Sequence, residues 1–68
     1  MRERGRSILD FVKRFPDGVS MTEILRREAD DQIEARAAIT DLINRDIVLL
    51  TLDRNGNKII KHNKATAR

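Results

Sequence analysis

The sequence contains no cysteine and a single histidine among its 68 residues. Without cysteine the chain forms no disulfide, no thiolate metal site and no cysteine nucleophile. The lack of cysteine also fits the reducing cytoplasm, where we expect this protein to act. The one histidine, His62, falls near the end of an expected strand, so we interpret it as a structural residue rather than a general base. We therefore expect neither an enzyme nor a bound metal or other cofactor.

Long apolar runs are also missing. No segment approaches the roughly 20 apolar residues that a membrane span requires, and we expect no signal peptide because no long apolar stretch follows residues 1–7. The composition, with 40% hydrophobic and 37% charged residues, is apolar enough to fold. A chain of this length forms one domain at most and buries only about 60% of its unfolded surface, so we expect marginal stability.

The formal net charge of +3 is unevenly distributed along the chain. Residues 1–14 hold five basic and two acidic side chains, residues 15–53 hold four basic and nine acidic, and residues 54–68 hold five basic and no acidic. Basic ends around an acidic centre are typical of arms that contact a polyanion, and equally of solvated tails that maintain solubility. Charge alone leaves both interpretations open.

Two helices are predicted in the first half of the chain from apolar spacing and capping residues. The first begins at the N-cap Ser7 and ends at Phe15–Pro16, because a residue that precedes proline leaves the α region. The second begins with a capping box at Ser20 and ends near Arg27 or Glu28.

A third helix is capped by Asp30 or Asp31 and ends before Asp46, which we expect in the left-handed conformation usual for glycine. Its inward side is predicted to be the apolar stripe of Ala35, Ala38, Ile39, Leu42 and Ile43. The opposite side is predicted to carry Ile33, Arg36, Ala37, Thr40 and Asn44.

A β-hairpin is predicted after the helices. Residues 47–52 are rich in branched apolar residues, the Asn55–Gly56 pair is a strong hairpin signal, and residues 58–62 form the returning strand. The predicted fold class is thus α+β, mainly α. We expect a flexible basic arm at residues 1–6, a domain at residues 7–62, and a frayed basic tail at residues 63–68, which have no apolar anchor.

The segments Ser20–Leu25 and Ala35–Val48 resemble the winged helix-turn-helix superfamily. Their pattern is a short capped helix, then a helix with paired apolar positions, a leucine (here Leu42) and two strand residues. Asp46 stands where that superfamily usually has glycine. The resemblance covers roughly residues 7–62 and implies three helices followed by a hairpin, the wing.

This resemblance implies a DNA-binding protein, either a small transcriptional regulator or an accessory factor. The third helix would enter the major groove of double-stranded DNA, and the wing would contact the backbone or minor groove. The implied base contacts are those of Gln32, Arg36 and Thr40. Backbone contacts from the second helix would come from Met21, Thr22, Arg26 and Arg27. The wing would contribute Arg54, Asn55, Lys58 and Lys61, and the arm Arg2, Arg4 and Arg6.

Each of these cations also has a structural interpretation. Arg36 is placed to pair with Asp41 or Thr40 on a solvated surface. The cations of the wing are also typical of charges that protect an edge strand from aggregation. Arg26 and Arg27 are typical of a solvated helix face, and the basic arm of a solvated tail.

Three carboxylates at the start of the third helix oppose a simple interaction with DNA. Asp30, Asp31 and Glu34 complement the helix dipole, but they repel phosphates. Helix capping explains these residues with fewer assumptions than a metal site does. The alternative function is a protein–protein interaction module whose surface consists of Ile33, Glu34 and Ala37.

We expect a monomer or a weak homodimer that does not contact membranes. Association would use the first helix, with Phe11 and Phe15, or the exposed side of residues 47–50.

Overall fold

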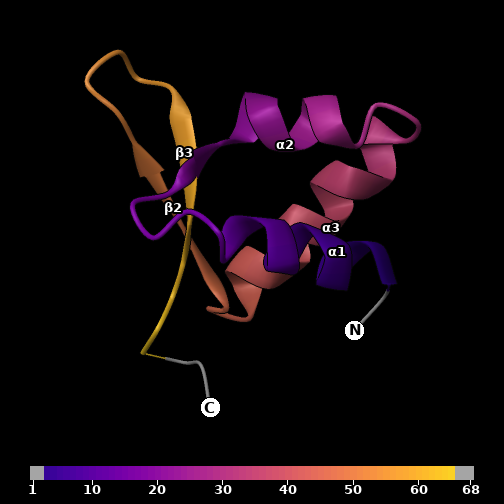
Figure 1. The fold of residues 1–68 in the computed structure, drawn as a ribbon, viewed down its shortest axis with the longest axis horizontal. Coiled ribbons are helices and arrows are strands. Elements are labelled where there is room, and N and C mark those ends of the chain that lie inside the picture. The colour runs from indigo at the N-terminus through magenta and orange to yellow at the C-terminus, as the bar shows by residue number, and fades with distance from the viewer. Residues whose placement is uncertain (1–2, 66–68) are drawn as a thin grey trace.

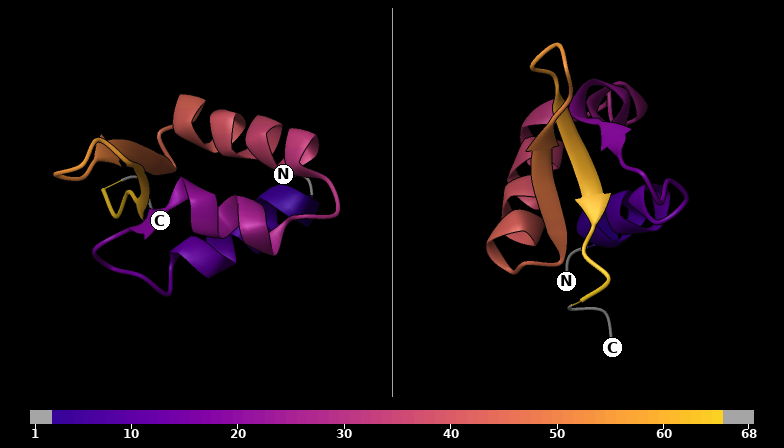
Figure 2. Two further views of the ribbon diagram at one scale, coloured as in Figure 1. Left: turned by 90° about the horizontal axis from the view of Figure 1, so that it is seen from above. Right: turned by 90° about the vertical axis from the view of Figure 1, so that its left-hand side faces the viewer.

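A computed structural model describes residues 3–65, in which three helices pack against a three-stranded antiparallel sheet (Figure 1). The elements follow the order α1 (Glu3–Val12), β1 (Val19–Ser20), α2 (Met21–Arg27), α3 (Gln32–Asn44), β2 (Val48–Leu52) and β3 (Lys58–His62). The helices gather on one side of the sheet, and the turn between β2 and β3 projects beyond them (Figure 2). The architecture is α+β and mainly helical, as predicted.

Helix α1 begins earlier than the sequence predicted. It starts at Glu3, so Ser7 lies inside the helix and is not its N-cap. The flexible arm predicted at residues 1–6 is therefore wrong for the residues that the structure describes, whereas Arg2 lies outside them. The additional turn is held by tertiary contacts, since Arg4 forms ion pairs with carboxylates that follow α2.

A two-residue strand, β1, adds a third strand that the sequence did not predict. Val19 pairs with Ile60 and Ser20 with Ile59, which gives the strand order β1-β3-β2. So short a strand has no alternating pattern by which periodicity could reveal it. Gly18, directly before β1, has a φ of 98°, and a Cβ at this position would lie 2.5 Å from Cγ2 of Ile59. Glycine is therefore required where the chain enters the sheet.

Helices α2 and α3 begin at predicted N-caps. Ser20 Oγ accepts a hydrogen bond from the backbone N–H of Glu23 at 3.1 Å, and Asp31 Oδ1 accepts one from Glu34 at 3.0 Å. Each bond satisfies a first-turn N–H that has no partner within the helix. Asp31, rather than the other candidate, is thus the cap of α3. Asp46 has a φ of 59°, which confirms the left-handed conformation predicted there.

The predicted hairpin is present. Strands β2 and β3 are antiparallel over five residue pairs. The loop comprises residues 54–56 and is closed by a hydrogen bond of 3.0 Å from Asp53 N to Asn57 O. Gly56 has a φ of 80°, as expected for a type I turn followed by a left-handed residue.

The segment after β3 is anchored by Asn63, so the predicted frayed tail is wrong for residues 63–65. The backbone N–H of Asn63 donates to the carbonyl of Ile47 at 3.0 Å, and its side-chain Nδ2 donates to the carbonyl of Asp46 at 2.8 Å. A polar anchor of this kind leaves no apolar signal in the sequence. The rest of the predicted tail, residues 66–68, lies outside the described part of the chain.

The core lies between the helices and the sheet. Helix α3 contributes Ala35, Ile39 and Leu42, with Ala38 and Ile43 half-buried beside them, which confirms the predicted inward stripe. The other elements contribute the buried side chains of Ile8, Leu9, Val12, Val19, Ile24, Leu25, Val48 and Ile60. No helix within residues 3–65 combines the length and apolar character needed to cross a membrane.

Candidate functional site

The side of α3 that points away from the core, here called the outer face of α3, is a candidate binding surface. It consists of the residues predicted to lie there, and all of them are exposed: Ile33, Arg36, Ala37, Thr40 and Asn44. The large apolar side chain of Ile33 is 84% exposed. The outer face therefore combines apolar, hydroxyl, amide and cationic groups on one surface.

The guanidinium of Arg36 is available to a ligand. Its expected alternative partner, Asp41, pairs instead with Arg45 at 3.2 Å. Within residues 3–65, no ion pair and no side-chain hydrogen bond involves Arg36. All five donors of its planar group thus remain for hydrogen bonds to a partner.

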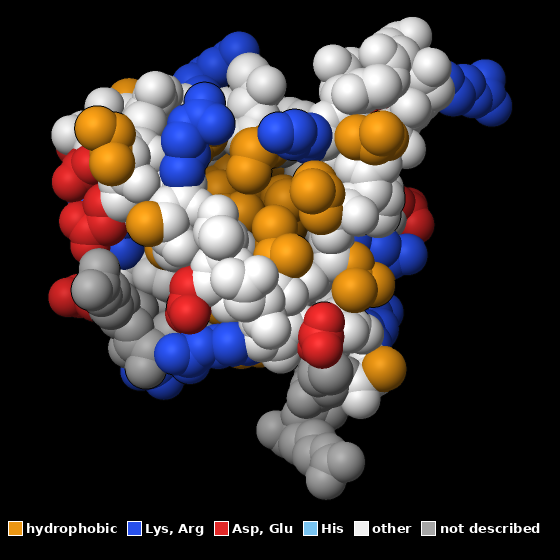
Figure 3. Space-filling view, turned by 180° about the vertical axis from the view of Figure 1, so that it is seen from behind, with side chains coloured by type: hydrophobic (Ala, Val, Ile, Leu, Met, Phe, Trp, Pro, Cys, Tyr) orange, Lys and Arg blue, Asp and Glu red, His pale blue; other side chains and the backbone are white. Residues whose placement is uncertain are grey.

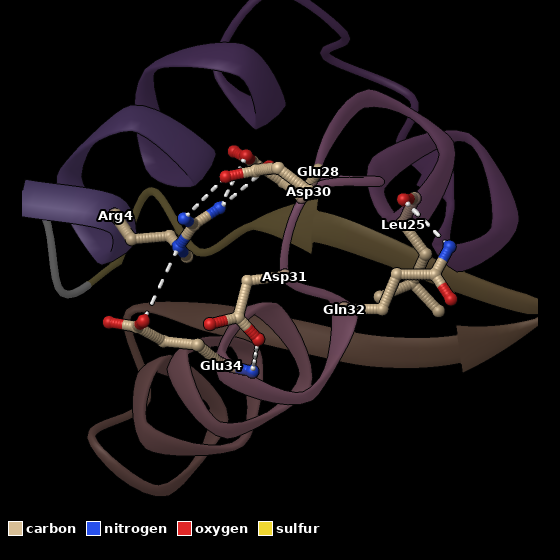
Figure 4. Close-up of polar contacts among 7 residues, drawn as sticks. All are labelled: Arg4, Leu25, Glu28, Asp30, Asp31, Gln32 and Glu34. Carbon is tan, nitrogen blue, oxygen red and sulfur yellow. Dashed lines mark hydrogen bonds and ion pairs between the residues drawn. The ribbon is translucent and has the colours of Figure 1, made fainter.

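Gln32 has a structural contact that the sequence did not predict. Its Nε2 donates to the backbone carbonyl of Leu25 at 3.1 Å, and the side chain points toward α2 in the close-up view (Figure 4). This bond ties the start of α3 to the end of α2. This bond engages one of the two N–H donors of the Gln32 amide, and the contact with adenine that we expected from the sequence stays a prediction.

Arg4 joins the carboxylates around the start of α3 (Figure 4). Its guanidinium lies 2.9 Å from Glu28, 2.9 Å from Asp30 and 3.8 Å from Glu34. We call these four residues the Arg4 cluster. It connects α1 to the end of α2, the following turn and α3, so the prediction of Arg4 as part of a flexible arm that reaches a ligand is wrong.

The Arg4 cluster also changes the electrostatics of this region. The hydrogen bond from Arg4, and then its charge, hold the pKa of Asp30 below its ordinary value. The same hydrogen bond raises the pKa of Arg4, so the pair stays ionised. With Asp31 used as the helix cap, the carboxylates that opposed a polyanion partner are engaged within the protein.

The basic end of α2 is engaged as well. Arg26 pairs with Glu23 at 3.1 Å. The guanidinium of Arg27 lies 4.6 Å from the centroid of the Phe11 ring, which is a cation–π contact between α2 and α1. At the start of α2 are the two other predicted contact residues, the half-buried Met21 and the exposed Thr22.

The hairpin carries exposed cations on both of its sides. Side chains alternate along β3, so Lys58 lies on the side of the buried Ile60, which faces the helices, and Lys61 lies on the opposite side. Arg54 is exposed in the loop. None of these three cations forms an ion pair in the part of the chain that is described. Of the two lysines in β3, Lys58 is therefore the one whose side chain lies on the side of the sheet that faces α3.

Asp53 organises the loop that carries Arg54 and Asn55. Its carboxylate accepts hydrogen bonds from the backbone N–H of Asn55 at 2.8 Å, from the backbone N–H of Asn57 at 2.9 Å and from Nδ2 of Asn57 at 3.0 Å. These bonds, that from the Asn57 backbone first, lower the pKa of Asp53. The loop thus presents its cation from a defined backbone conformation.

Two leucines of β2 form an apolar area between the hairpin and α3. Leu50 is 46% and Leu52 is 65% exposed, and both share the helix-facing side of β2 with the buried Val48. Figure 3 shows hydrophobic side chains gathered on this face of the molecule, with Lys and Arg side chains beside them. We expected exposure within residues 47–50 but missed Leu52, which is exposed because the hairpin extends beyond the helices.

A groove with a volume of about 540 Å³ lies beside the outer face, between α1 and α3. Its lining includes Gly5, Glu34, Ala37 and Arg45.

His62 is half-buried at the end of β3. In residues 3–65, no group of three or more His, Cys, Asp and Glu side chains is placed to hold a metal ion.

No model of a protein family, no curated protein and no solved structure matches this chain.

Proposed function

We propose that this chain is a winged helix-turn-helix protein that binds double-stranded DNA. The order of the elements and the strand order β1-β3-β2 fit that architecture, with the β2–β3 hairpin as the wing. In this proposal α3 enters the major groove, and the wing lies against the backbone or in the minor groove. The biological role would be that of a small transcriptional regulator or an accessory DNA-binding factor.

One observation carries this proposal: the cations of the outer face and the wing are unpaired, whereas nearby carboxylates are bound. Arg36, Arg54 and Lys58 form no ion pair among residues 3–65. Two carboxylates near the start of α3, those of Asp30 and Glu34, lie 2.9 and 3.8 Å from Arg4. A phosphate that approaches the outer face and the wing therefore meets unpaired cations, while Arg4 offsets one of the negative charges near the start of α3.

The proposed contacts follow from the chemistry of each side chain. The planar group of Arg36 fits O6 and N7 of guanine, and the Thr40 hydroxyl, one turn along the outer face, hydrogen-bonds to a base edge or a phosphate. Arg54 and Lys58 bind phosphates and fix the position of the wing. Arg4 is excluded from this interface because its carboxylate partners already hold it.

A titration of a fluorescent random-sequence duplex at two salt concentrations tests the proposal. The logarithm of the affinity is expected to fall with the logarithm of the salt concentration by about 0.9 per phosphate contacted. Arg54→Ala and Lys58→Ala are each expected to reduce this slope by about 1. Lys13→Ala is the matched control, since it removes an equal charge from an exposed position directly after α1.

One result would refute DNA binding, and another would refute the role of the wing. One is a lack of binding to any duplex at low salt. The other is an equal loss of affinity for Lys13→Ala and Arg54→Ala, which would mean that net charge, rather than the wing, attracts the DNA.

The 84% exposure of Ile33 favours a second candidate function, a protein-interaction module. In that case Ile33, Glu34 and Ala37 form the contact with a partner protein, and the neighbouring apolar area of Leu50 and Leu52 extends it. Ile33→Asp would then abolish binding while Arg54→Ala would leave it unchanged. The DNA-binding proposal expects the wing variant to matter at every salt concentration where binding is measurable.

A further inference from the structure

The outer face of α3 has an apolar part that the proposed phosphate and guanine contacts do not use. Ile33 is 84% exposed, and Ala37 is exposed one helical turn further on. Residues four apart are neighbours on a helix surface, so the two side chains form one apolar strip. Arg36 lies beside this strip.

This strip does not stabilise the fold. Ile33 and Ala37 do not belong to the hydrophobic core, nor to the half-buried side chains packed against it. The carboxylates nearest in sequence are held elsewhere: Asp31 accepts the N–H of Glu34, and the Glu34 carboxylate lies 3.8 Å from Arg4 (Figure 4). The first two turns of the outer face therefore present an apolar strip and a cation, with these acids engaged inside the protein.

In the major groove, thymine offers an apolar group, its C5 methyl, and guanine offers the acceptors O6 and N7 that arginine binds. Recognition helices contact base edges mainly through their N-terminal residues, and Ile33, Arg36 and Ala37 occupy that half of α3. A separation of three or four residues along a helix is about 5 Å, which corresponds to between one and two base-pair steps.

We propose that Ile33 and Ala37 bind thymine methyl groups while Arg36 binds a guanine within about two base pairs, so that the protein selects duplexes in which thymine lies close to guanine. This specificity rests on the proposed DNA-binding function and goes beyond it. Removal of the methyl from thymine gives uracil, which pairs with adenine in the same way but leaves the apolar strip without its partner. The burial of one methyl predicts about fourfold weaker binding for each contacted thymine that is replaced.

The experiment begins with the selection of preferred duplexes from a random pool. The selected duplex is then compared with an otherwise identical duplex in which deoxyuridine replaces each thymidine. The unmodified protein is expected to bind the uracil duplex about fourfold more weakly per contacted methyl. Ile33→Ala is expected to lose the part of the discrimination that comes from the methyl against Ile33, about fourfold, and to keep the part that comes from Ala37.

Leu49→Ala is the matched control, since it truncates another exposed leucine-sized side chain, 42% exposed, on the side of β2 that faces away from the helices. It should keep the full discrimination against uracil. Equal binding of both duplexes by the unmodified protein would overturn the inference while leaving DNA binding intact. Undiminished discrimination in Ile33→Ala would also overturn it. No binding to any duplex would instead refute the proposed function.

Discussion

Arg4 is the residue whose contacts change the interpretation of the chain most. In sequence it belongs to a basic segment suited to a polyanion, yet its side chain is only 21% exposed and pairs with Glu28 and Asp30. These partners lie 24 and 26 positions away. One side chain thus extends α1 by a turn and engages acids near the candidate DNA-binding surface.

Replacement of Arg4 tests this dual role. Arg4→Ala is expected to lower the melting temperature by several degrees, because it leaves the buried Glu28 carboxylate without its hydrogen bond of 2.9 Å. It should also weaken the proposed DNA binding, because it leaves acids near the start of α3 unpaired. Arg6→Ala is the control, because Arg6 is an exposed arginine on the same helix. Equal melting temperatures for the two variants, measured by circular dichroism, would contradict the role assigned to Arg4.

The lowered pKa of Asp30 predicts how stability depends on pH. The pKa in the folded state lies below the ordinary value of 3.8, because Arg4 donates a hydrogen bond to the carboxylate. The folded state therefore gains stability at pH values above the unfolded pKa, and this gain is lost as the pH falls through 3.8 toward the folded pKa. Thermal unfolding between about pH 3 and pH 6 should show a smaller loss on acidification for Asp30→Asn than for the unmodified protein. Asp17→Asn, in an exposed turn, should follow the unmodified curve.

Among the elements, β1 is the shortest and yet connects two parts of the fold. Its two residues join the connection between α1 and α2 to the hairpin, through Val19 opposite Ile60 and Ser20 opposite Ile59. Ser20 is at the same time the N-cap of α2. The position of α2 relative to the hairpin is therefore fixed by one residue that belongs to both a strand and a helix cap.

Gly18→Ala tests this junction. The substitution places a Cβ at a φ of 98° and 2.5 Å from Cγ2 of Ile59, so it should destabilise the fold by about 1–3 kcal/mol in a urea titration. Gly56→Asn is the comparison, because Gly56 also has a positive φ, of 80°, but open space around it. Asparagine tolerates that conformation, so we expect a loss below about 1 kcal/mol. Similar losses for both variants would mean that the close approach to Ile59 has no energetic effect.

The molecule as a whole depends on one core shared by all its elements, since each helix and each strand contributes at least one buried side chain. A chain this short has little stability in reserve, because a small domain buries a modest fraction of its surface.

The expected association state, a monomer or a weak homodimer, remains a prediction that sedimentation at two protein concentrations would test.

Leu42→Ala should show how small the free energy of unfolding of this domain is. Leu42 is almost fully buried, so its truncation is expected to cost about 2–5 kcal/mol, a large share of the stability of a domain this small. The urea midpoint should fall sharply, or the cooperative transition should disappear. Leu49→Ala, at a 42% exposed position, should cost less than about 1 kcal/mol. A small effect of Leu42→Ala would show that α3 is not anchored through this side chain.

The sequence by itself determined the local features of this protein. The cap at Ser20, the left-handed Asp46 and the inward stripe of α3 were predicted correctly, and the cap of α3 is one of the two predicted candidates, Asp31. These features depend on residues within one or two turns of each other, so their capping and periodic patterns are visible in the chain. The exposed outer face of α3 was predicted for the same reason.

Only the tertiary structure decided which polar groups remain free. Arg4 and Gln32 have the residue types expected at a nucleic-acid interface, but packing brings each to an internal partner. Arg36 remains unpaired within residues 3–65, because Asp41, five residues on, lies about 140° around the helix and pairs with Arg45. The strand β1 was also decided by tertiary structure, because its partner strand lies about forty positions away in sequence. Such contacts depend on which surfaces meet after folding, and the pattern of neighbouring residues does not encode that.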